Sequence, residues 1–347
     1  KRLNLSFSSY TVLIKFLFCS IVYNNTLFSN FDFLSTGKII KSTGSRYLVK
    51  SNAGIFSCVL KGKIRLDGRK TTNPVAVGDK VDFEIENEEN AAIINVHPRK
   101  NYIIRKSINL SKQSQILASN LDQVAIVATI IKPSTSLGFL DRVLITAEAY
   151  SIPAKIIFNK IDLLNKEENN FLQEVITLYS GIGYECFLAS CEGENNSEDT
   201  KKNLLPLLIN KTTLLLGHSG AGKSSIINVL QPSLNLKTGE ISSAHDKGMH
   251  TTTFAELHTL DSDAEIIDTP GIKELGLVEM KREEVGHYFP EILRQVNDCK
   301  FNNCLHINEP GCAVLQALEK NEISAERYQS YCGILSGEEM DWKKWEV

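Results

Sequence analysis

The chain has 347 residues, 42% of them hydrophobic and 23% charged, which is an ordinary soluble composition and long enough for two or three domains. Three of its eight cysteines fall within fourteen residues beside a histidine, a clustering typical of a metal site. Cys19, Cys58 and Cys186 pair with nothing by spacing, so the composition excludes a disulfide scaffold and favours a reducing, cytoplasmic compartment.

The formal net charge of −3 hides an asymmetry between two parts of the chain. Residues 36–106 contain 14 Lys and Arg against 7 Asp and Glu, whereas residues 107–347 contain 21 against 33. A basic module therefore precedes an acidic body. Such a module is expected to contact a polyanion, although the same excess is compatible with a merely solvated surface.

Residues 1–35 lack the pattern of a folded domain. An apolar run between Val12 and Val22 looks like a signal sequence, but Lys15 interrupts it and no small-residue cleavage site follows. The run is also shorter than the ~20 apolar residues that cross a bilayer. We therefore expect a disordered or spurious extension here and no membrane attachment.

Residues 36–106 are predicted to form an all-β domain. Short strand-like runs alternate with glycine-containing turns, as in a small Greek-key barrel of the OB type. Tyr47, Phe56 and Phe83, interleaved with Lys and Arg, suit an RNA-binding surface on which rings stack on bases. The alternative is that these rings fill the barrel core. Residues 99–106 are basic and are predicted to be a linker close to the ligand.

From residue 121 onward the pattern changes to alternating strands and helices. Residues 122–130 read as a buried strand, residues 138–152 as an amphipathic helix and residues 154–158 as the next strand. This alternation predicts a doubly wound α/β domain, in which ligands bind at the carboxyl ends of the strands.

The sequence NKID follows the third of these segments and is a candidate guanine-binding loop. The Asp162 carboxylate can accept hydrogen bonds from the ring N–H and the exocyclic amine of guanine, and adenine offers neither in that geometry. Asn159 is expected to brace the loop and the base. Residues after the next strand are expected to offer backbone N–H groups to the guanine carbonyl. The predicted guanine contacts are Asn159, Lys160, Ile161, Asp162, Ser190 and Cys191.

Residues 217–224 spell G-x-x-x-x-G-K-S between a short apolar strand and a helical run, which is the pattern of a phosphate-binding loop. Backbone N–H groups of such a loop surround the phosphates at the N-terminus of the helix. Lys223 is expected to reach the β- and γ-phosphates and the Ser224 hydroxyl to bind Mg²⁺. The alternative, a chance match in a Gly-rich loop, is disfavoured by the strand and helix. The predicted contacts are Gly217, His218, Ser219, Gly220, Ala221, Gly222, Lys223, Ser224 and Ser225.

The candidate guanine loop precedes the phosphate loop, the reverse of the order in ordinary GTPases. The chain is therefore predicted to be circularly permuted. Loops at the carboxyl edge of one sheet meet the same ligand whatever the order of the strands that carry them.

Two further segments complete the predicted GTP site. In the sequence HTTT, Thr251 or Thr252 is expected to complete the coordination of Mg²⁺ and to sense the γ-phosphate. In the sequence DTPG, Asp268 is the expected partner of Mg²⁺, directly or through water, and the Gly271 N–H is the expected donor to the γ-phosphate.

Hydrolysis is expected to be slow without a partner. Many GTPases orient the attacking water with a Gln just after the glycine of DTPG, but Ile272 occupies this position. His250 is the candidate catalytic residue. The alternative is that it is a structural residue of its loop.

Cys299, Cys304, His306 and Cys312 supply three thiolates and an imidazole, a donor set that closes a tetrahedral structural zinc site and leaves no position for chemistry. One zinc ion per chain would hold together a segment too small to support a core alone. The alternative is free core cysteines.

Together the basic β-module, NKID, GHSGAGKSS, HTTT, DTPG, FPE at residues 289–291 and CKFNNCLHINEPGCAV resemble the circularly permuted small ribosomal subunit biogenesis GTPases of the RsgA family. The resemblance runs from about residue 36 to residue 331. One departure is Met249, where the family usually carries Arg.

The resemblance implies a multi-domain α/β protein. It implies an OB domain at residues 36–106, a permuted GTPase domain at 107–280 and a zinc-binding α-helical domain at 281–347. It also implies that the protein binds rRNA and hydrolyses GTP to GDP and phosphate late in small-subunit maturation, stimulated by that subunit. We expect a cytoplasmic monomer. The alternative is a GTP-gated RNA-binding module in which hydrolysis is incidental.

Overall fold

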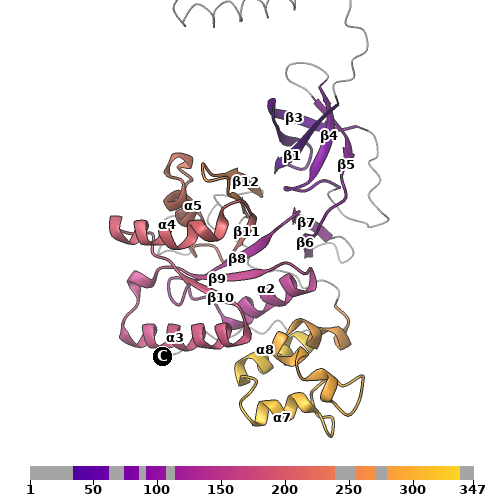
Figure 1. Cartoon of the computed structure of the whole chain (residues 1–347), viewed down its shortest axis with the longest axis vertical. Helices are drawn as coiled ribbons and strands as arrows, with labels where there is room; N and C mark the ends of the chain where they lie inside the picture. The colour runs from indigo at the N-terminus through magenta and orange to yellow at the C-terminus, as the bar shows by residue number, and fades with distance from the viewer. Residues whose placement is uncertain are drawn as a thin grey trace, which may run out of the picture.

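The structure is a computed structural model, and it describes residues 34–61, 74–85, 91–106, 114–238, 255–269 and 280–336. A β-barrel, a central α/β part and a small helical part follow one another along the long axis of the molecule (Figure 1). Within those residues, the structure contains no helix with the length and apolar character needed to span a membrane.

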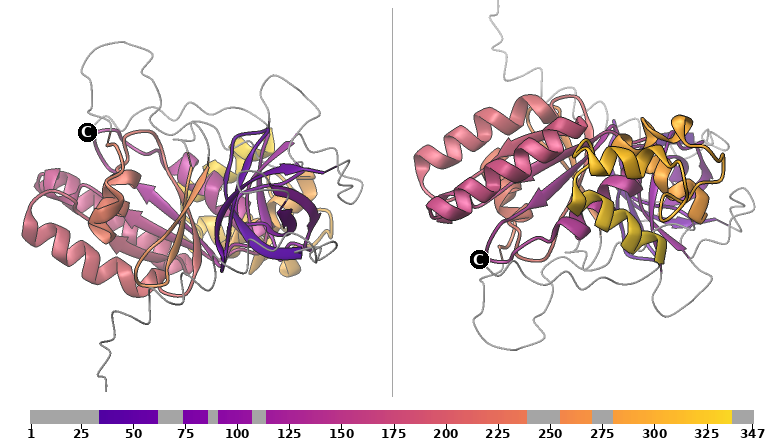
Figure 2. Two further views of the ribbon diagram at one scale, coloured as in Figure 1. Left: turned by 90° about the horizontal axis from the view of Figure 1, so that it is seen from above. Right: turned by 90° about the horizontal axis from the view of Figure 1, so that it is seen from below.

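The barrel closes because its first strand pairs on both sides. β1 is antiparallel to β2 and to β4, while β3 runs parallel to β5. Seen from above, the strands surround a common interior (Figure 2). This arrangement confirms the predicted OB-type barrel. Its strands are β1 (Leu34–Ser42), β2 (Tyr47–Ser51), β3 (Gly54–Leu60), β4 (Lys80–Ile85) and β5 (Ala91–Val96).

The aromatic residues for which RNA stacking and a core role were both open lie in or against this interior. Tyr47 is 1% exposed and Phe83 is 0% exposed, so neither ring is available to a base. Phe56 packs against Phe83 with ring centroids 5.3 Å apart. Of the two roles left open, the barrel core is therefore the one that Tyr47 and Phe83 take. Strand alternation turns both rings inward, where burial of their large apolar area stabilises the barrel.

The segment predicted to be a basic linker is instead the first strand of a hairpin. β6 (Tyr102–Lys106) pairs antiparallel with β7 (Ser114–Ser119). Ile103 is 1% exposed, because it packs into the same core as the barrel. Arg99, just before the hairpin, donates to the buried carboxylate of Asp79 at 2.7 and 2.6 Å. The prediction weighed the charges of this segment and overlooked its apolar alternation.

The central part is a sheet with helices on both faces (Figure 1), which confirms the predicted doubly wound α/β domain. Its strand order is β10-β9-β8-β11-β13-β12, with β12 antiparallel to β13 and the other pairs parallel. The strands are β8 (Gln123–Ala128), β9 (Ala154–Phe158), β10 (Glu185–Leu188), β11 (Thr212–Leu216), β12 (Glu256–Thr259) and β13 (Glu265–Asp268). β12 also pairs with β1 of the barrel, so one sheet of eleven strands runs through both parts.

Each face of the central sheet has its own core. Leu140 of α2 and Leu172 of α3 pack on one face, and Leu204 of α4 and Ile226 of α5 on the other. The helices are α2 (Leu137–Ala149), α3 (Lys166–Ile182), α4 (Glu194–Leu208) and α5 (Lys223–Leu230), with 3₁₀ turns η1 (Ile161–Leu163) and η2 (Pro232–Leu234).

The helical part packs on α2 through apolar and ionic contacts. Ile145 of α2 belongs to its apolar core. Arg327, 1% exposed, donates to Asp141 of α2 at 2.6 Å and to Glu291 at 2.6 Å. The helical part and α2 are therefore joined through a buried charge network. The elements are η3 (Arg282–Tyr288), α6 (Pro290–Leu293), η4 (Val296–Asp298), α7 (Ala313–Glu319) and α8 (Ala325–Ser336).

Candidate functional site

The candidate nucleotide site lies at the carboxyl edge of the central sheet. NKID begins directly after β9, the phosphate loop directly after β11, and Asp268 ends β13. β8, β9, β11 and β13 are parallel, so these loops emerge at one edge although they are far apart in the sequence.

Close approach of neighbouring groups explains two glycines of the phosphate loop. At Gly217 a Cβ atom would lie 2.5 Å from the carbonyl oxygen of Val127. At Gly222, where φ is +93°, it would lie 2.2 Å from Nδ2 of Asn159. The second contact joins the phosphate loop to the NKID loop, because the Asn159 amide also donates to the carbonyl oxygen of Ala221 at 2.9 Å. The two predicted loops therefore form one structural unit.

The NKID loop is held in place by contacts from three directions. Ser190 Oγ donates to Asp162 Oδ1 at 2.5 Å. Lys160, in the left-handed region at φ +62°, donates to the carbonyl oxygen of Lys132 at 2.5 Å. Ile161 N–H lies 3.4 Å from the carbonyl oxygen of Ala189. These contacts place the Asp162 carboxylate beside the end of β10, where a base can approach.

Ser190 differs from its predicted role. Its backbone N–H donates to Thr200 Oγ1 at 2.8 Å, and the Thr200 hydroxyl donates back to the Ser190 carbonyl oxygen at 2.8 Å. The N–H that we predicted to meet the guanine carbonyl is therefore already bonded. Its contact with the NKID loop is instead made by its hydroxyl, which donates to Asp162. Cys191 lies with its sulfur 3.7 Å from Asn159 Oδ1, and burial raises the pKa of its thiol to about 12.

Lys223 and Asp268 are the two buried charges of the site, 7% and 3% exposed. Lys223 Nζ donates to the carbonyl oxygens of Gly217 and His218 at 2.8 and 3.1 Å. Burial raises the pKa of Asp268 to about 6, although the Lys223 charge acts in the opposite direction. Oδ1 of Asp268 has no hydrogen-bond partner among the described residues. A buried carboxylate oxygen without a donor is suited to bind a cation.

The remaining residues of the phosphate loop occupy its rim and the first turn of α5. Ser224 and Ser225 follow Lys223 in that turn, Ala221 is buried and Ser219 is exposed. The ring centroids of His218 and of Phe139 on α2 lie 3.9 Å apart. His250, Thr251, Thr252, Gly271 and Ile272 lie outside the described residues.

Phe139 and Thr200 were missed from the sequence. Both lie on helices that pack beside the loops, Phe139 against His218 and Thr200 against Ser190. Neither belongs to a motif, and a single aromatic or hydroxyl residue on an amphipathic helix carries no signal of its own.

The four predicted metal ligands meet in the helical part. One ligand atom from each of Cys299, Cys304, His306 and Cys312 lies within 4.8 Å of the others. Three of the separations are 3.9 Å for Cys299 Sγ to Cys312 Sγ, and 3.6 and 3.4 Å from His306 Nδ1 to these two sulfurs. Tetrahedral zinc, with Zn–S about 2.3 Å and Zn–N about 2.0 Å, requires edges of roughly 3.5 to 3.8 Å.

A carboxylate that was not predicted shapes the metal loop. Glu309 accepts backbone N–H groups of Leu305 and Ile307 at 2.8 Å and of Asn308 at 3.1 Å. Burial alone would raise the pKa of Glu309, but these donors lower it below its ordinary value. The Tyr331 hydroxyl donates to the carbonyl oxygen of Leu305 at 2.7 Å. The loop therefore has its own scaffold around the four donors.

Comparison with known proteins gives matches over most of the chain. The sequence profile described as the RsgA N-terminal domain matches residues 36–93, and the profile described as RsgA GTPase matches residues 96–278. Small ribosomal subunit biogenesis GTPase RsgA 2 of Bacteroides thetaiotaomicron is 52% identical over 304 residues, which cover 87% of this chain and 97% of that protein. Small ribosomal subunit biogenesis GTPase RsgA of Christiangramia forsetii is 50% identical over 311 residues, 88% of this chain and 98% of that protein.

Two solved structures share the fold. The crystal structure of YjeQ from Thermotoga maritima has a TM-score of 0.69 and 29% identity, and the match covers 88% of this chain and 98% of that one. The crystal structure of YloQ, described as a circularly permuted GTPase, has a TM-score of 0.65 and 28% identity, covering 89% and 97%.

Proposed function

The chain belongs to the RsgA GTPase family, and on that premise we propose that it binds rRNA and hydrolyses GTP to GDP and phosphate in late maturation of the small ribosomal subunit, which stimulates it. The observation that carries the proposal is the hydrogen bond from Asn159 to Ala221. It unites a guanine-type loop with a phosphate loop at one sheet edge, as a guanine nucleotide requires.

The proposed nucleotide contacts follow from that unit. Asp162, held by Ser190, accepts from guanine, and Asn159 fixes the loop beside the base. Lys223 exchanges its two carbonyl partners for the β- and γ-phosphates. The N–H groups of the phosphate loop, residues 217–225, surround the phosphates. Adenine lacks the two donors that guanine offers to Asp162 and would leave this carboxylate unpaired. The site therefore discriminates strongly against adenine.

Asp268 and Ser224 fit Mg²⁺. The unpartnered Oδ1 of Asp268 and the hydroxyl of Ser224, one residue beyond Lys223, are hard oxygen donors. When bound, Mg²⁺ would neutralise negative charge on the phosphates. Thr251 or Thr252 and the Gly271 N–H are proposed to complete the γ-phosphate side. His250 is the proposed catalytic residue.

The Cys299, Cys304, His306 and Cys312 cluster fits zinc, because three thiolates and an imidazole at these separations match the tetrahedron it prefers. The four protein donors fill the coordination sphere, so the proposed role of the ion is structural. It cross-links a helical part that consists of short helices and turns.

The basic module at residues 36–106 is the proposed rRNA-binding domain, with the GTPase domain at 107–280 and the zinc-binding domain at 281–347. Its charge excess supports this assignment, since binding to polyanions depends chiefly on Lys and Arg. We further propose that the protein acts as a cytoplasmic monomer without membrane attachment. Its partners are then the small subunit with its rRNA, and GTP or GDP.

The decisive experiment measures phosphate release from GTP by the full chain, with and without small ribosomal subunits. Strong stimulation by the subunit is the expected result. Asp162→Ala, the control, is expected to lose GTP binding and to show no stimulated hydrolysis at GTP concentrations that saturate the wild type. Equal rates with and without subunits would favour the alternative, an RNA-binding module in which hydrolysis is incidental. Hydrolysis of ATP as readily as GTP would overturn the assigned base specificity.

A further inference from the structure

A loop that carries none of the predicted motifs lies beside both nucleotide loops. Residues 129–136, the β8–α2 loop, connect β8 to α2. In the sheet β8 lies between β9 and β11, the strands that lead into the NKID loop and the phosphate loop, and it is parallel to both. The β8–α2 loop therefore emerges at the nucleotide edge, between the two loops that form the proposed site.

The β8–α2 loop contacts one residue of each neighbouring loop. The carbonyl oxygen of Lys132 accepts a hydrogen bond of 2.5 Å from Nζ of Lys160 in the NKID loop. On the other side, Cδ of Pro133 lies 3.4 Å from the position that a Cβ atom on Gly220 of the phosphate loop would occupy, which is van der Waals contact. The loop thus lies against the base side and the phosphate side of the proposed site.

Both residues of the bond between Lys160 and Lys132 have a backbone conformation that side chains disfavour. The φ angle is +62° at Lys160 and +50° at Lys132, in the left-handed region. Residues other than glycine remain there only where the surrounding structure holds them, and such positions cluster at ligand sites. The contacts that hold Lys132 in place therefore bear on how the site works.

Two buried threonines tie the ends of the β8–α2 loop together. The Thr129 N–H donates to Thr135 Oγ1 at 3.0 Å, and the Thr135 N–H donates back to the Thr129 carbonyl oxygen at 2.8 Å. The Thr129 hydroxyl also donates to the carbonyl oxygen of Pro133. Lys132 lies inside the loop that these bonds close, so its carbonyl oxygen is held by the two threonines.

The ammonium group of Lys160 is the group that this carbonyl oxygen fixes. A lysine can lie with its apolar stem along a ring only if its charged end reaches a polar partner beyond it. The Lys132 carbonyl oxygen supplies that partner before any ligand binds. Because the partner is held in advance, less side-chain freedom has to be lost when the base enters.

We propose that Thr135 is a positioning residue of the guanine site. Its hydroxyl closes the β8–α2 loop, the closed loop presents the Lys132 carbonyl oxygen to Lys160, and the anchored Lys160 keeps its stem against the base. The inference rests on the proposed function, because it requires that the NKID loop binds guanine. It extends the site by a segment that carries no nucleotide-binding motif.

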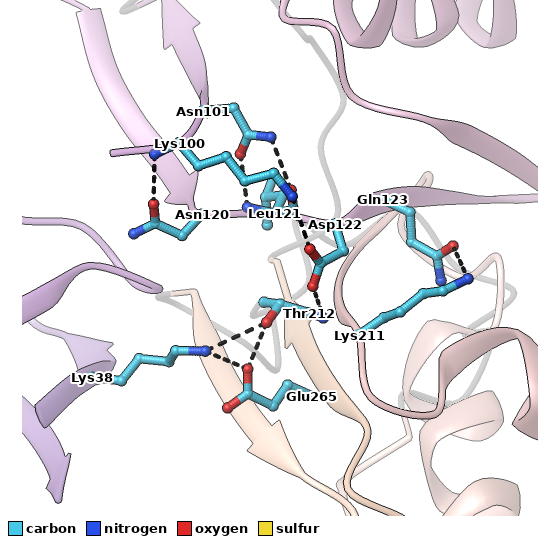
Figure 3. A network of polar contacts seen from close by, with 10 residues as sticks. All are labelled: Lys38, Lys100, Asn101, Asn120, Leu121, Asp122, Gln123, Lys211, Thr212 and Glu265. Atoms are coloured by element: carbon cyan, nitrogen blue, oxygen red, sulfur yellow. Dashed lines mark hydrogen bonds and ion pairs between the residues drawn. The ribbon is translucent and has the colours of Figure 1, made fainter. Parts of the chain in front are cut away.

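Thr212 provides a matched control at the opposite edge of the sheet. It is 6% exposed, against 7% for Thr135, and its hydroxyl donates to Glu265 Oε2 at 2.6 Å (Figure 3). Thr212 is the first residue of β11, whereas the phosphate loop follows the last residue of that strand. Thr212→Val therefore removes a buried, hydrogen-bonded hydroxyl of the same kind without touching the nucleotide edge.

The test is calorimetric titration of the full chain with GDP, and with ADP in parallel. For Thr135→Val we expect the Kd of GDP to rise about two- to tenfold, the range that corresponds to the loss of one hydrogen bond. Thr135→Ser keeps the hydroxyl and is expected to bind GDP as the wild type does, and so is Thr212→Val.

Thr129→Val opens the same loop from its other end and is expected to weaken GDP binding in the same direction. Pro133 is exposed, so water can satisfy the carbonyl oxygen that the Thr129 hydroxyl releases. This variant decides the question if Thr135→Val does not fold. Unchanged GDP affinity in the folded threonine variants of the loop would overturn the proposal, as would an equal loss in Thr212→Val.

Lys160→Met separates an effect through Lys160 from a general effect on the site. Met keeps an apolar stem but offers no ammonium group, so Lys160→Met combined with Thr135→Val is expected to bind GDP no more weakly than Lys160→Met alone. Losses that add in the double variant would overturn the proposed route.

The wild type separates the two levels of inference. If it binds GDP no more tightly than ADP, the proposed guanine site itself is wrong. A clear preference for GDP, together with unchanged affinity in the loop variants, would mean that only the role of Thr135 fails.

Discussion

The side-chain nitrogen of Asn159 lies only 2.2 Å from the position that a Cβ atom on Gly222 would occupy. The same nitrogen donates a hydrogen bond of 2.9 Å to the carbonyl oxygen of Ala221, the residue before Gly222. The loop proposed to read the base and the loop proposed to hold the phosphates therefore share one contact. A substitution in either loop at this contact is therefore expected to displace the other.

Gly222→Ala is expected to displace Asn159 and to lower GTP and GDP affinity by at least tenfold, because the new methyl group would overlap the amide. Gly183→Ala is the matched control, since Gly183 also has a positive φ, +122°, but nothing within 4 Å of its ideal Cβ. The control reports the backbone strain alone, about 1 kcal/mol of stability. Calorimetric titration with GDP compares the two, and equal affinities would contradict the predicted overlap.

The raised pKa of Asp268 predicts a pH dependence of stability. Its folded value of about 6 lies above the ordinary 3.8, so the stability contributed by the protonated carboxyl is present below pH 4 and is lost as pH rises through 6. In the nucleotide-free protein this loss is on the order of 3 kcal/mol. Urea unfolding between pH 4 and pH 7 should show it in the wild type and not in Asp268→Asn. Parallel curves for the two proteins would disprove it.

The same carboxyl predicts a pH dependence of Mg²⁺ binding. Protons compete with the metal for Asp268, so Mg²⁺-dependent nucleotide affinity is expected to fall as pH is lowered through about 6. Nucleotide titrations at pH 5.5 and pH 7.5, each with Mg²⁺ and with a chelator, measure the effect. An affinity ratio that does not change with pH would count against the assignment.

Arg327→Met is expected to destabilise the protein by about 3–5 kcal/mol, because it leaves the carboxylates of Asp141 and Glu291 buried without their cation. Lys281→Ala, which removes an exposed pair with Glu284, is the control and should cost less than ~0.5 kcal/mol. Chemical denaturation followed by far-UV circular dichroism compares them. A similar small loss in both variants would show that the buried network contributes little.

Glu309→Ala is expected to weaken zinc binding roughly 10- to 100-fold without removing a ligand, since the backbone around Leu305 and Ile307 loses its acceptor. Competition with a chromogenic chelator measures the affinity, and elemental analysis should give one zinc ion per wild-type chain. Glu319→Ala, on the exposed end of α7, is the control. Retention of wild-type affinity by Glu309→Ala would refute the role of this carboxylate.

Hydrophobic periodicity and motif spacing predicted the barrel, the doubly wound sheet and the Cys₃His cluster, because each rests on residues that are close in sequence or repeat regularly. The ion pairs between the barrel and the central sheet were beyond such reasoning. Lys41 and Glu256 are 215 residues apart, and an isolated Lys or Glu on a strand reads as a solvated side chain.

The error at residues 99–106 and the open choice for Tyr47 have a common physical origin. Charge and ring chemistry suggested a linker and an RNA-stacking surface, whereas the alternation of side chains along a strand turns Ile103 and Tyr47 inward. The bond from the Ser190 N–H to Thr200 was beyond sequence reasoning for another reason, because no local pattern specifies the orientation of the helix that carries Thr200.

The buried bonds of Arg327 to Asp141 and Glu291 also determine which parts of the molecule can shift independently. Helix α2 ends one strand away from the NKID loop, and the helical part is joined to that helix by charges that water does not reach. A displacement of the helical part away from α2 would therefore expose Asp141 and Glu291 without their cation, which is costly. The barrel contacts the central sheet through lysine pairs that are partly open to solvent, so separating them costs less.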